Sequence, residues 1–436
     1  MEIITKNNIK KYSTYKNSGV EWLGEIPEHW EVKPGFTILS ESKKKNTGFI
    51  EKTVLSLSYG NVIIKPKEKL TGLVPESFET YQLVKPGDII IRPTDLQNDK
   101  KSLRTGLAKN NGIITSAYIN LRINTKNDND YYHYYLHTID INKVIYGLGS
   151  GLRQNISFLD FKRFPFPTPP LPEQTKIAEF LDDKTKKIDE AIAIKTQQIN
   201  LLKERKQILI HKAVTRGLDT NVKLKNSGVE WIGEIPVGWE VVPLVKYSTR
   251  IDYRGKTPEK VDEGIFLVTT KNIKEGLINY DISKEYVKQK DYNFIMSRGT
   301  PKIGDLLFTM EAPLGQSAVV DVENIAIAQR IIKFRFIEDS FDSYFVNYFI
   351  QTNKFQLELQ KEGTGSTALG IKASKLHKLK LIKPPLSEQK EISSYIEKSS
   401  EKIARAIGLK SEEIEKLKEY KSSLINSVVT GKVKVC

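Results

Sequence analysis

A segment of 17 residues occurs twice in this chain, and this repetition constrains the fold more than any other feature. Residues 16–32 read KNSGVEWLGEIPEHWEV and residues 225–241 read KNSGVEWIGEIPVGWEV, so that fourteen of seventeen positions are identical. A second match joins PPLPEQ at 169–174 to PPLSEQ at 384–389. The residues between the two landmarks show little similarity. The chain therefore contains two copies of one framework with divergent interiors, which suggests one kind of task performed on two different targets.

A long helix is predicted to begin at each copy of the second landmark. Residues 172–216 and 387–431 contain almost no glycine, lack proline after their first turn, and are rich in Lys, Glu, Ile, Leu and Gln. Seven positions in each stretch, spaced by three and four residues, form a stripe, and the two stripes agree in identity. We expect the stripes to pack together as a coiled coil, the alternative being that each packs on its own domain. The seam comprises Ile188, Ile192, Lys195, Ile199, Leu202, Lys206 and Leu209, with Ile403, Ile407, Lys410, Ile414, Leu417, Lys421 and Leu424.

The direction of the helix pair follows from the reach of the chain that joins the two copies. A helix of about 42 residues is about 60 Å long, whereas the link from Arg216 to Lys225 spans at most about 30 Å. The second domain must begin near the far end of the first helix, so the second helix runs back antiparallel to the first. We expect an α+β protein with a pseudo-two-fold internal repeat. Its parts are a first domain at 1–170, a helix at 171–217, a linker and second domain at 218–385, and a helix at 386–436.

Each domain is predicted to mix helices and strands. Runs such as VLSLSYGNVII and LVKPGDIIIRP cluster β-forming residues between Gly, Pro and Asn. Residues 130–146 and 341–361 have the pattern of helices. Two mixed α/β domains joined by the paired helices are the expected architecture.

The charge of the chain points to a polyanionic partner. Lys and Arg number 68 against 53 acidic residues, giving a net charge of +15 and a pI near 9.3. Charge alone does not separate DNA from RNA or from an anionic membrane surface. No apolar run approaches the roughly 20 residues that a membrane span needs. The single cysteine, Cys436, cannot form an internal disulfide framework, and a reducing, cytoplasmic setting is expected.

Basic and amide side chains of the divergent interiors are the candidates for contact with nucleic acid. Arg and Lys suit phosphates and guanine edges, and Asn and Gln suit adenine. Any one of them could instead be a solvated surface charge. The candidates are Lys43, Lys44, Lys45, Arg92, Lys100, Lys101, Arg104, Arg153, Gln154 and Asn155 in the first copy, and Arg250, Arg254, Lys256, Lys271, Asn272, Arg298, Lys302, Gln329 and Arg330 in the second.

A nuclease centre is an alternative use of the first interior. Asp88, followed by Asp99-Lys100-Lys101, has the pattern of carboxylates that hold a metal ion and a lysine that steadies the attacking water. At the matching distance after Asp305 the second copy has Gln316-Ser317-Ala318. A Gly-Asp pair before an apolar run is more simply a turn that enters a strand, and we prefer this interpretation.

Other motifs of catalysis or metal binding are weaker. His133 and His137 share a helical face at a spacing suited to a metal ion, but no third ligand is evident, and packing among the neighbouring tyrosines is favoured. Gly255-Lys256-Thr257 resembles the end of a phosphate-binding loop, yet Arg250 stands where that motif needs glycine. No methyl-donor glycine motif or Asn-Pro-Pro-aromatic motif occurs. The chain is predicted to have no catalytic residues and no metal of its own.

All four tryptophans fall in the repeated segment. Residues identical in both copies cannot distinguish two targets, so structural anchoring is the favoured role. The tryptophans are Trp22, Trp30, Trp231 and Trp239.

The doubled SGVEW–GEIP–W segment, the doubled PPL–EQ helix entry and the helix ending in Ala213-Val214-Thr215-Arg216-Gly217 resemble the specificity subunits of type I restriction-modification enzymes over essentially the whole chain. The resemblance implies two target recognition domains, each reading one half of a split, asymmetric sequence in double-stranded DNA, with helices that set the unread gap. It also implies two methyltransferase subunits and two restriction subunits as partners. Adenine methylation with S-adenosylmethionine, and cleavage with ATP and magnesium, would belong to those partners.

Two other functions remain as alternatives. One is a coiled-coil scaffold that binds DNA without sequence preference, which salt-dependent but sequence-blind binding would support. The other is the self-sufficient nuclease based on Asp88, Asp99 and Lys101.

Overall fold

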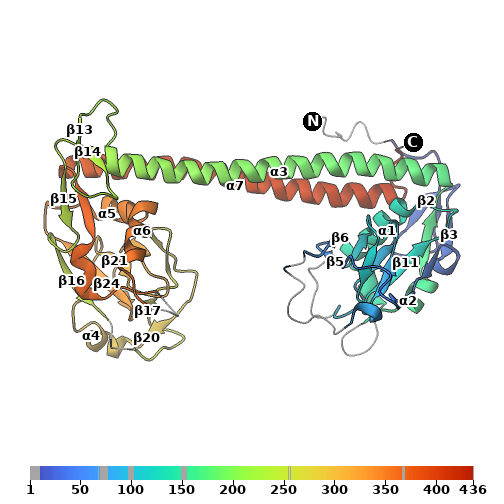
Figure 1. The fold of residues 1–436 in the computed structure, drawn as a ribbon, viewed down its shortest axis with the longest axis horizontal. Helices are drawn as coiled ribbons and strands as arrows, with labels where there is room; N and C mark the ends of the chain where they lie inside the picture. The colour runs from blue at the N-terminus through green and yellow to red at the C-terminus, as the bar shows by residue number, and fades with distance from the viewer. Residues whose placement is uncertain are drawn as a thin grey trace. The chain divides into compact units, whose positions relative to one another are not determined.

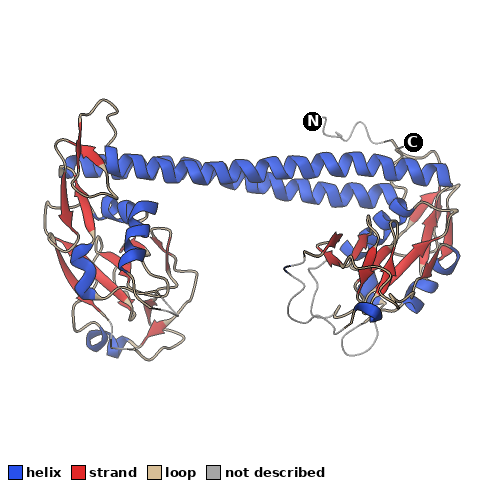
Figure 2. Cartoon of the chain, in the orientation of Figure 1, coloured by secondary structure: helices blue, strands red, loops and turns tan. Residues whose placement is uncertain are grey.

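Two compact units make up this computed structural model. The first unit comprises Met1–Thr196 with Glu412–Cys436, and the second comprises Gln197–Ser411. The boundary lies within both long helices, so each unit contains part of each helix (Figure 2). The structure describes residues 10–66, 68, 77–96, 103–148, 155–253, 255, 257–365 and 369–435.

The two long helices lie where the sequence predicts them. Helix α3 spans Leu171–Arg216 and helix α7 spans Leu386–Val429 (Figure 1). Gly217 and Gly431 follow their C-terminal ends with φ of 77° and 74°. The left-handed conformation is open to glycine without a Cβ clash, so each glycine ends its helix at a defined residue.

Ion pairs within the first unit give the relative direction of the two helices there. Lys195 lies 2.6 Å from Glu413, and Lys421 lies 2.7 Å from Asp189. As residue numbers fall along α3 they rise along α7, so these segments are antiparallel. All fourteen predicted seam positions are buried or half-buried. Ile188 and Leu424 also belong to the core of the first unit, so at this end the stripe packs both between the helices and against the domain.

Each unit contains a four-stranded antiparallel sheet with equivalent strand order. Chain order and register make the two sheets counterparts, although their sequences differ. The first has the order β4-β11-β8-β9, with β4 Leu39–Glu41, β11 Ile119–Ile123, β8 Ile89–Ile91 and β9 Thr105–Leu107. The second has the order β16-β24-β21-β22, with β16 Ser248–Asp252, β24 Ile331–Phe336, β21 Leu306–Thr309 and β22 Ser317–Val319.

The repeated segments also form equivalent elements in both units. Two two-stranded antiparallel sheets and one helix recur in each unit (Figure 1). In the first unit these are β1 Tyr15–Asn17 with β2 Glu25–Pro27, β3 Glu31–Pro34 with β12 Pro165–Thr168, and α1 Asn129–Ile141. In the second they are β13 Leu224–Asn226 with β14 Glu234–Pro236, β15 Glu240–Pro243 with β25 Lys380–Lys383, and α5 Ser343–Ile350.

The interiors carry elements that are not shared. The first unit has β5 Leu55–Ser58 paired with β6 Asn61–Ile64, β7 Gln82–Val84 paired with β10 Gly112–Ile114, and α2 Phe158–Lys162. The second has β17 Ile265–Val268 between β20 Tyr286–Val287 and β23 Ala326–Ile327, β18 Ile273–Lys274 paired with β19 Leu277–Ile278, α4 Tyr292–Ile295, and α6 Asn353–Glu362.

One sequence prediction needs correction: residues 341–361 form two helices, α5 and α6, and not one. The hydroxyl of Thr352 accepts a hydrogen bond from the backbone N–H of Phe355 and caps the second helix. This local bond competes with continuation of the first helix.

The last residues of the chain complete the core of the first unit. Val428 and Val429 are buried with the aromatic side chains of α1, and the Tyr131 hydroxyl donates to the Val429 carbonyl at 3.2 Å. The backbone N–H of Lys434 donates to the Lys10 carbonyl at 2.8 Å. The first compact unit therefore combines Met1–Thr196 with the segment Glu412–Cys436. Among the residues described, no helix combines the length and apolarity that crossing a membrane requires.

Candidate nucleic-acid interface

The repeated tryptophans anchor each unit to a long helix. The Trp30 indole N–H donates to Glu173 at 3.1 Å, and the Trp239 indole N–H donates to Glu388 at 2.9 Å. Both indoles are buried. Each also lies against a helix-ending glycine, Gly431 or Gly217 respectively, where any Cβ would be crowded.

The other two tryptophans also pack inside their units. The Trp22 ring stacks on Phe164 with centroids 6.1 Å apart, and the Trp231 ring tilts against Phe349 at 6.2 Å. The interpretation of the four tryptophans as structural anchors agrees with these contacts.

The glutamines of the PPL–EQ segments join each long helix to its domain. Gln174 accepts a hydrogen bond from the backbone N–H of Asp128 at 2.9 Å, and Gln389 accepts one from Asp342 at 2.9 Å. Asp128 caps α1 and Asp342 caps α5. The framework is thus a set of equivalent buried hydrogen bonds, which explains why these residue types occur twice.

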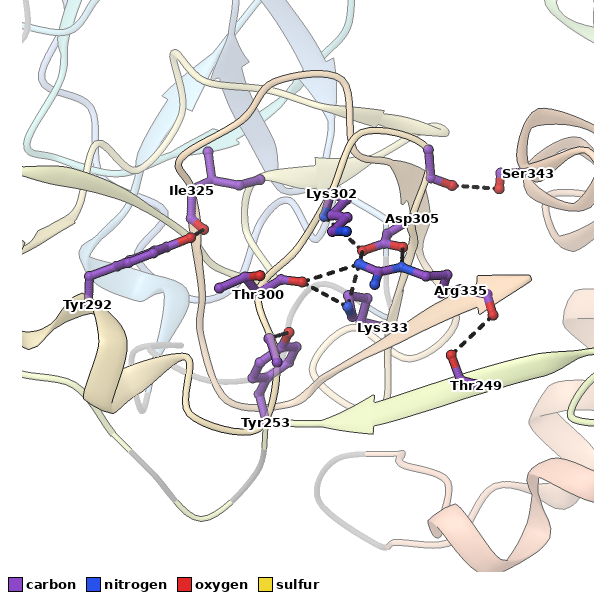
Figure 3. Close-up of polar contacts among 12 residues, drawn as sticks. Thr249, Tyr253, Tyr292, Thr300, Lys302, Asp305, Ile325, Lys333, Arg335 and Ser343 are labelled. Carbon is purple, nitrogen blue, oxygen red and sulfur yellow. Dashed lines mark hydrogen bonds and ion pairs between the residues drawn. The ribbon is translucent and has the colours of Figure 1, made fainter. Parts of the chain in front are cut away.

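The aspartate of each Gly-Asp pair is buried and forms an ion pair with a partly exposed arginine. Asp88 receives two hydrogen bonds of 3.0 Å from Arg122, and Asp305 receives two of 2.7 Å from Arg335 (Figure 3). Lys333, which is 2% exposed, lies 3.1 Å from Asp305. Burial raises the pKa of Asp305, but the bonds from Arg335 and from the Lys302 backbone outweigh it and hold that pKa below its usual value.

This geometry disfavours the nuclease alternative. Asp88 is 2% exposed, and both its carboxylate oxygens accept bonds from Arg122. Asp99 and Lys101 lie outside the described residues. Within the ranges that are described, no cluster of His, Cys, Asp and Glu could hold a metal ion. The Gly-Asp turn acts as a clamp between neighbouring strands.

The histidine pair packs inside the first unit. Burial lowers the pKa of His133 to about 3 and that of His137 to about 4, so both rings are neutral near pH 7. Their ring centroids are 6.1 Å apart, and His133 also lies 5.8 Å from the Tyr134 ring. Aromatic packing, the preferred prediction, accounts for this placement.

Two predicted DNA contacts are wrong because their side chains are buried. Arg104 is fully buried and donates to the carbonyl oxygens of Thr94 at 2.6 Å and Asp95 at 3.0 Å. Asn272 is also fully buried, and its side-chain oxygen accepts from the backbone N–H of Thr269 at 2.9 Å. Both side chains organise loops from within and are not available to DNA.

The remaining described candidates lie at or near the surface. Arg92 is half-buried, as is Gln329; Lys43, Lys44, Lys45, Asn155, Arg250, Lys271, Arg298, Lys302 and Arg330 are exposed. Several are held by internal partners, such as Lys43 at 2.9 Å from Glu41 and Arg330 at 3.1 Å from Glu311. Lys100, Lys101, Arg153, Gln154, Arg254 and Lys256 lie outside the described residues.

The sequence does not reveal which residues pair with the two aspartates of the Gly-Asp motifs. Arg122, Arg335 and Lys333 are brought to the aspartates by strand pairing between distant segments. The repeated Gly-Asp motif identifies the aspartates that accept the hydrogen bonds. It does not identify the basic side chains that donate them.

Two units that share a buried framework and differ in their interiors define a class: internally duplicated two-domain proteins with exposed basic side chains. The family model of the type I restriction modification DNA specificity domain matches residues 23–204 and 248–418. The chain belongs to this family, the specificity subunits of type I restriction-modification enzymes.

Three sequence relatives agree with this assignment. The chain is 26% identical to a candidate MjaX specificity subunit of Methanocaldococcus jannaschii, covering 95% of this chain and 96% of the relative. It is 27% identical to the MjaVIII specificity subunit of the same organism, covering 74% and 75%. The EcoKI specificity subunit of Escherichia coli is 23% identical, covering 86% and 82%.

Two solved structures share the fold. A chain from a study of complex assembly and conformational transition of the type I R-M system gives a TM-score of 0.69 at 14% identity, covering 93% of this chain and 98% of that one. The HsdS subunit from Thermoanaerobacter tengcongensis gives 0.52 at 15% identity, covering 94% and 98%.

Proposed function

We propose that this chain directs a type I restriction-modification complex to a bipartite, asymmetric sequence in double-stranded DNA, each unit reading one half. The observation that carries the proposal is the contrast within each unit. The framework contacts of Trp30 and Gln174 recur with Trp239 and Gln389, whereas the interiors differ in sequence and in their additional strands. A repeated framework supplies one way of binding, and divergent interiors supply two sequence preferences.

The catalytic steps are proposed to lie in partner subunits. Two methyltransferase subunits would use S-adenosylmethionine to methylate adenine, and two restriction subunits would use ATP and magnesium, in the cytoplasm. The solved structure with a TM-score of 0.69 comes from work on assembly of such a system, which supports partners of this kind. The chain itself would contribute recognition and no reacting group.

The test is to express the chain with its methyltransferase subunits and to map methylated adenines across the genome. We expect one bipartite motif with an invariant gap, absent when this chain is omitted. Methylation without a bipartite motif would favour the sequence-blind scaffold. Cleavage of DNA by the purified chain with Mg²⁺ alone would favour the nuclease.

The two long helices are proposed to form an antiparallel coiled coil that sets the unread gap. The ion pairs of Lys195 and Lys421 with the facing helix support this pairing. The test inserts one turn, about four residues, into both helices after Thr196 and after Ser411. We expect the gap to lengthen by about one to two base pairs, since one turn adds about 5.4 Å.

The half-sites should stay unchanged in that variant. An insertion into one helix alone is the matched control, and it should weaken methylation because the facing seams fall out of register. A changed half-site in the double insertion would contradict the proposal that the units read the half-sites while the helices set only the gap.

A further inference from the structure

A small pocket in the second unit opens at the ends of two parallel strands. β17 and β23 pair in parallel, with Leu267 opposite Ala326. Their carboxyl ends therefore meet at one edge, where ligands commonly bind in parallel sheets. A pocket of about 250 Å³ lies there, lined by Thr269, Thr270 and Lys271 after β17 and by Ala328, Gln329 and Arg330 after β23.

Arg330 is held at this pocket by its backbone and by a carboxylate. Its φ of 75° is left-handed, a conformation that non-glycine residues rarely adopt and that often marks functional positions. The guanidinium Nε lies 3.1 Å from Glu311, and the side chain is 49% exposed. Ala312, which follows Glu311 in the chain, also has a left-handed backbone. Its carbonyl accepts a hydrogen bond of 3.1 Å from the Thr270 hydroxyl. The arginine is thus fixed in place while part of it faces solvent.

The pocket offers hydrogen-bond donors in excess of acceptors. Glu285 lies 2.6 Å from Lys260 and neutralises it. The lining also includes Lys271, Gln329 and Arg330. The Arg330 Nε is paired with Glu311, and its side chain stays 49% exposed. A donor-rich pocket of this size suits a flat group with two adjacent acceptors.

The position of Arg330 differs between the units, as a sequence reader requires. In the second sheet Ile332 is opposite Phe308, which lies three residues after Asp305. In the first sheet Ile119 is opposite Ile91, which lies three residues after Asp88. By this register Arg330 corresponds to Ala117, and Glu311 corresponds to Thr94. The first unit therefore has no equivalent of the arginine–glutamate pair, whereas the tryptophan and glutamine contacts recur.

We propose that Arg330, on the lining of this pocket, reads the major-groove edge of a guanine in the half-site recognised by the second unit. Arg330 donates to guanine O6 and N7, the commonest specific contact between a side chain and a base, and Glu311 is a positioning residue that orients the guanidinium. This inference rests on the proposed function and adds the base and the residue that reads it.

The experiment uses the full chain with its methyltransferase subunits and maps the methylated motif for each variant. Arg330→Gly suits the left-handed backbone and removes the reader. We expect preference for one guanine in one half-site to fall by about 10- to 100-fold, with the other half-site unchanged. Arg330→Gln should shift the preference at that position toward adenine, because an amide pairs with the adenine edge.

Two further variants separate base reading from a general effect. Glu311→Gln leaves the backbone at Arg330 untouched and should weaken discrimination at the same base pair by several-fold. Lys302→Ala removes another exposed cation of the second unit and should weaken binding without changing the motif, as expected of a phosphate contact.

The outcomes distinguish the two proposals. If the wild-type chain yields no bipartite motif, the proposed function fails and this inference fails with it. If the wild-type motif is bipartite and Arg330→Gly or Glu311→Gln leaves it unchanged, or alters both half-sites equally, the inference alone is overturned. Loss of all methylation by Arg330→Gly and Arg330→Gln at wild-type melting temperature would also overturn it, because the role would then be general.

Discussion

The two units solve one structural problem with equivalent contacts and a second problem with different ones. Attachment to the long helices uses the same residue types twice: an indole on a glutamate, and a glutamine on the backbone of a helix cap. Around the sheets, the first unit adds two two-stranded sheets, whereas the second adds one two-stranded sheet and a three-stranded sheet with a parallel pair. Residues that hold the framework can be recognised because the same residue type recurs in both units. Residues that read a target should differ between the units.

The buried aspartate clamps fall between these extremes. Asp88 and Asp305 each bind an arginine from the neighbouring strand. Beside them the first unit places Asn120 and the second places Lys333, at equivalent positions in the sheet register. The first cluster is neutral, whereas the second carries one positive charge in excess. In the second unit, the ionised Asp305 compensates the charge of the buried Lys333.

Replacing the buried aspartates Asp88 and Asp305 should give the largest difference in stability loss between the two units. Asp305→Asn leaves Lys333 buried beside Arg335 without an anion, and removal of one partner from a buried ion pair costs about 3–5 kcal/mol. Asp88→Asn leaves only Arg122, which is 44% exposed and can reach water, so a loss of about 1–3 kcal/mol is expected. Hydrogen exchange resolved along the chain measures the stability of each unit separately.

A second substitution provides the control for that comparison. Lys333→Asn in the Asp305→Asn background gives the second unit the amide found in the first and should recover part of the lost stability. Equal destabilisation by the two aspartate variants would show that the lysine is not what distinguishes the clamps.

The local parts of this architecture could be predicted from the sequence, and the pairing of distant strands could not. The helices α3 and α7 and their seams follow from apolar spacing within one segment, since a helical stripe repeats every three to four residues. The partner of Asp88 is Arg122, which comes from a different strand, and nothing in the sequence near either residue specifies that register. The Gly-Asp turn was therefore predictable but its ion pair was not.

The buried candidates show a second limit of sequence reasoning. Arg104 and Asn272 are candidates from sequence because basic and amide residues are usually exposed and suit DNA. Arg104 instead satisfies backbone carbonyls of a loop, and Asn272 satisfies the turn after β17. Residue type predicted their hydrogen-bonding capacity, but only the fold decides whether the partner is inside or outside.

Acidification should destabilise the first unit through its histidine pair. Burial lowers the pKa of His133 to about 3 and that of His137 to about 4. The unfolded chain binds protons near pH 6.5 while the folded unit does not, so stability is complete above that pH and is lost as pH falls toward 3–4. At pH 5.5 the expected loss is about 2–3 kcal/mol for both rings together. Urea unfolding followed by hydrogen exchange between pH 7.5 and 5.5 provides the measurement.

The charged neighbours of the pair define the control. Lys109 and Lys421 disfavour protonation of the rings, while Asp130, Asp182 and Asp189 line the same cavity. In a double variant, His133→Gln with His137→Gln, the first unit should lose this pH dependence. If the wild-type first unit is as stable at pH 5.5 as at pH 7.5, the histidine pair is protonated in the folded state. The predicted acid sensitivity of the first unit would then be wrong.

The smallest expected effect concerns the contact that the units share. Trp30→Phe and Trp239→Phe each remove one indole N–H from a glutamate, at a cost of about 1 kcal/mol. Glu173 keeps bonds from Tyr12 at 2.6 Å and His29 at 2.8 Å, so the first unit should lose slightly less. Thermal unfolding of each variant, with hydrogen exchange to locate the loss, gives the two values. Similar stability losses in the two units would mean that both tryptophans are retained for the same contact with the long helix. A loss confined to one unit would mean that the identical tryptophans have different roles.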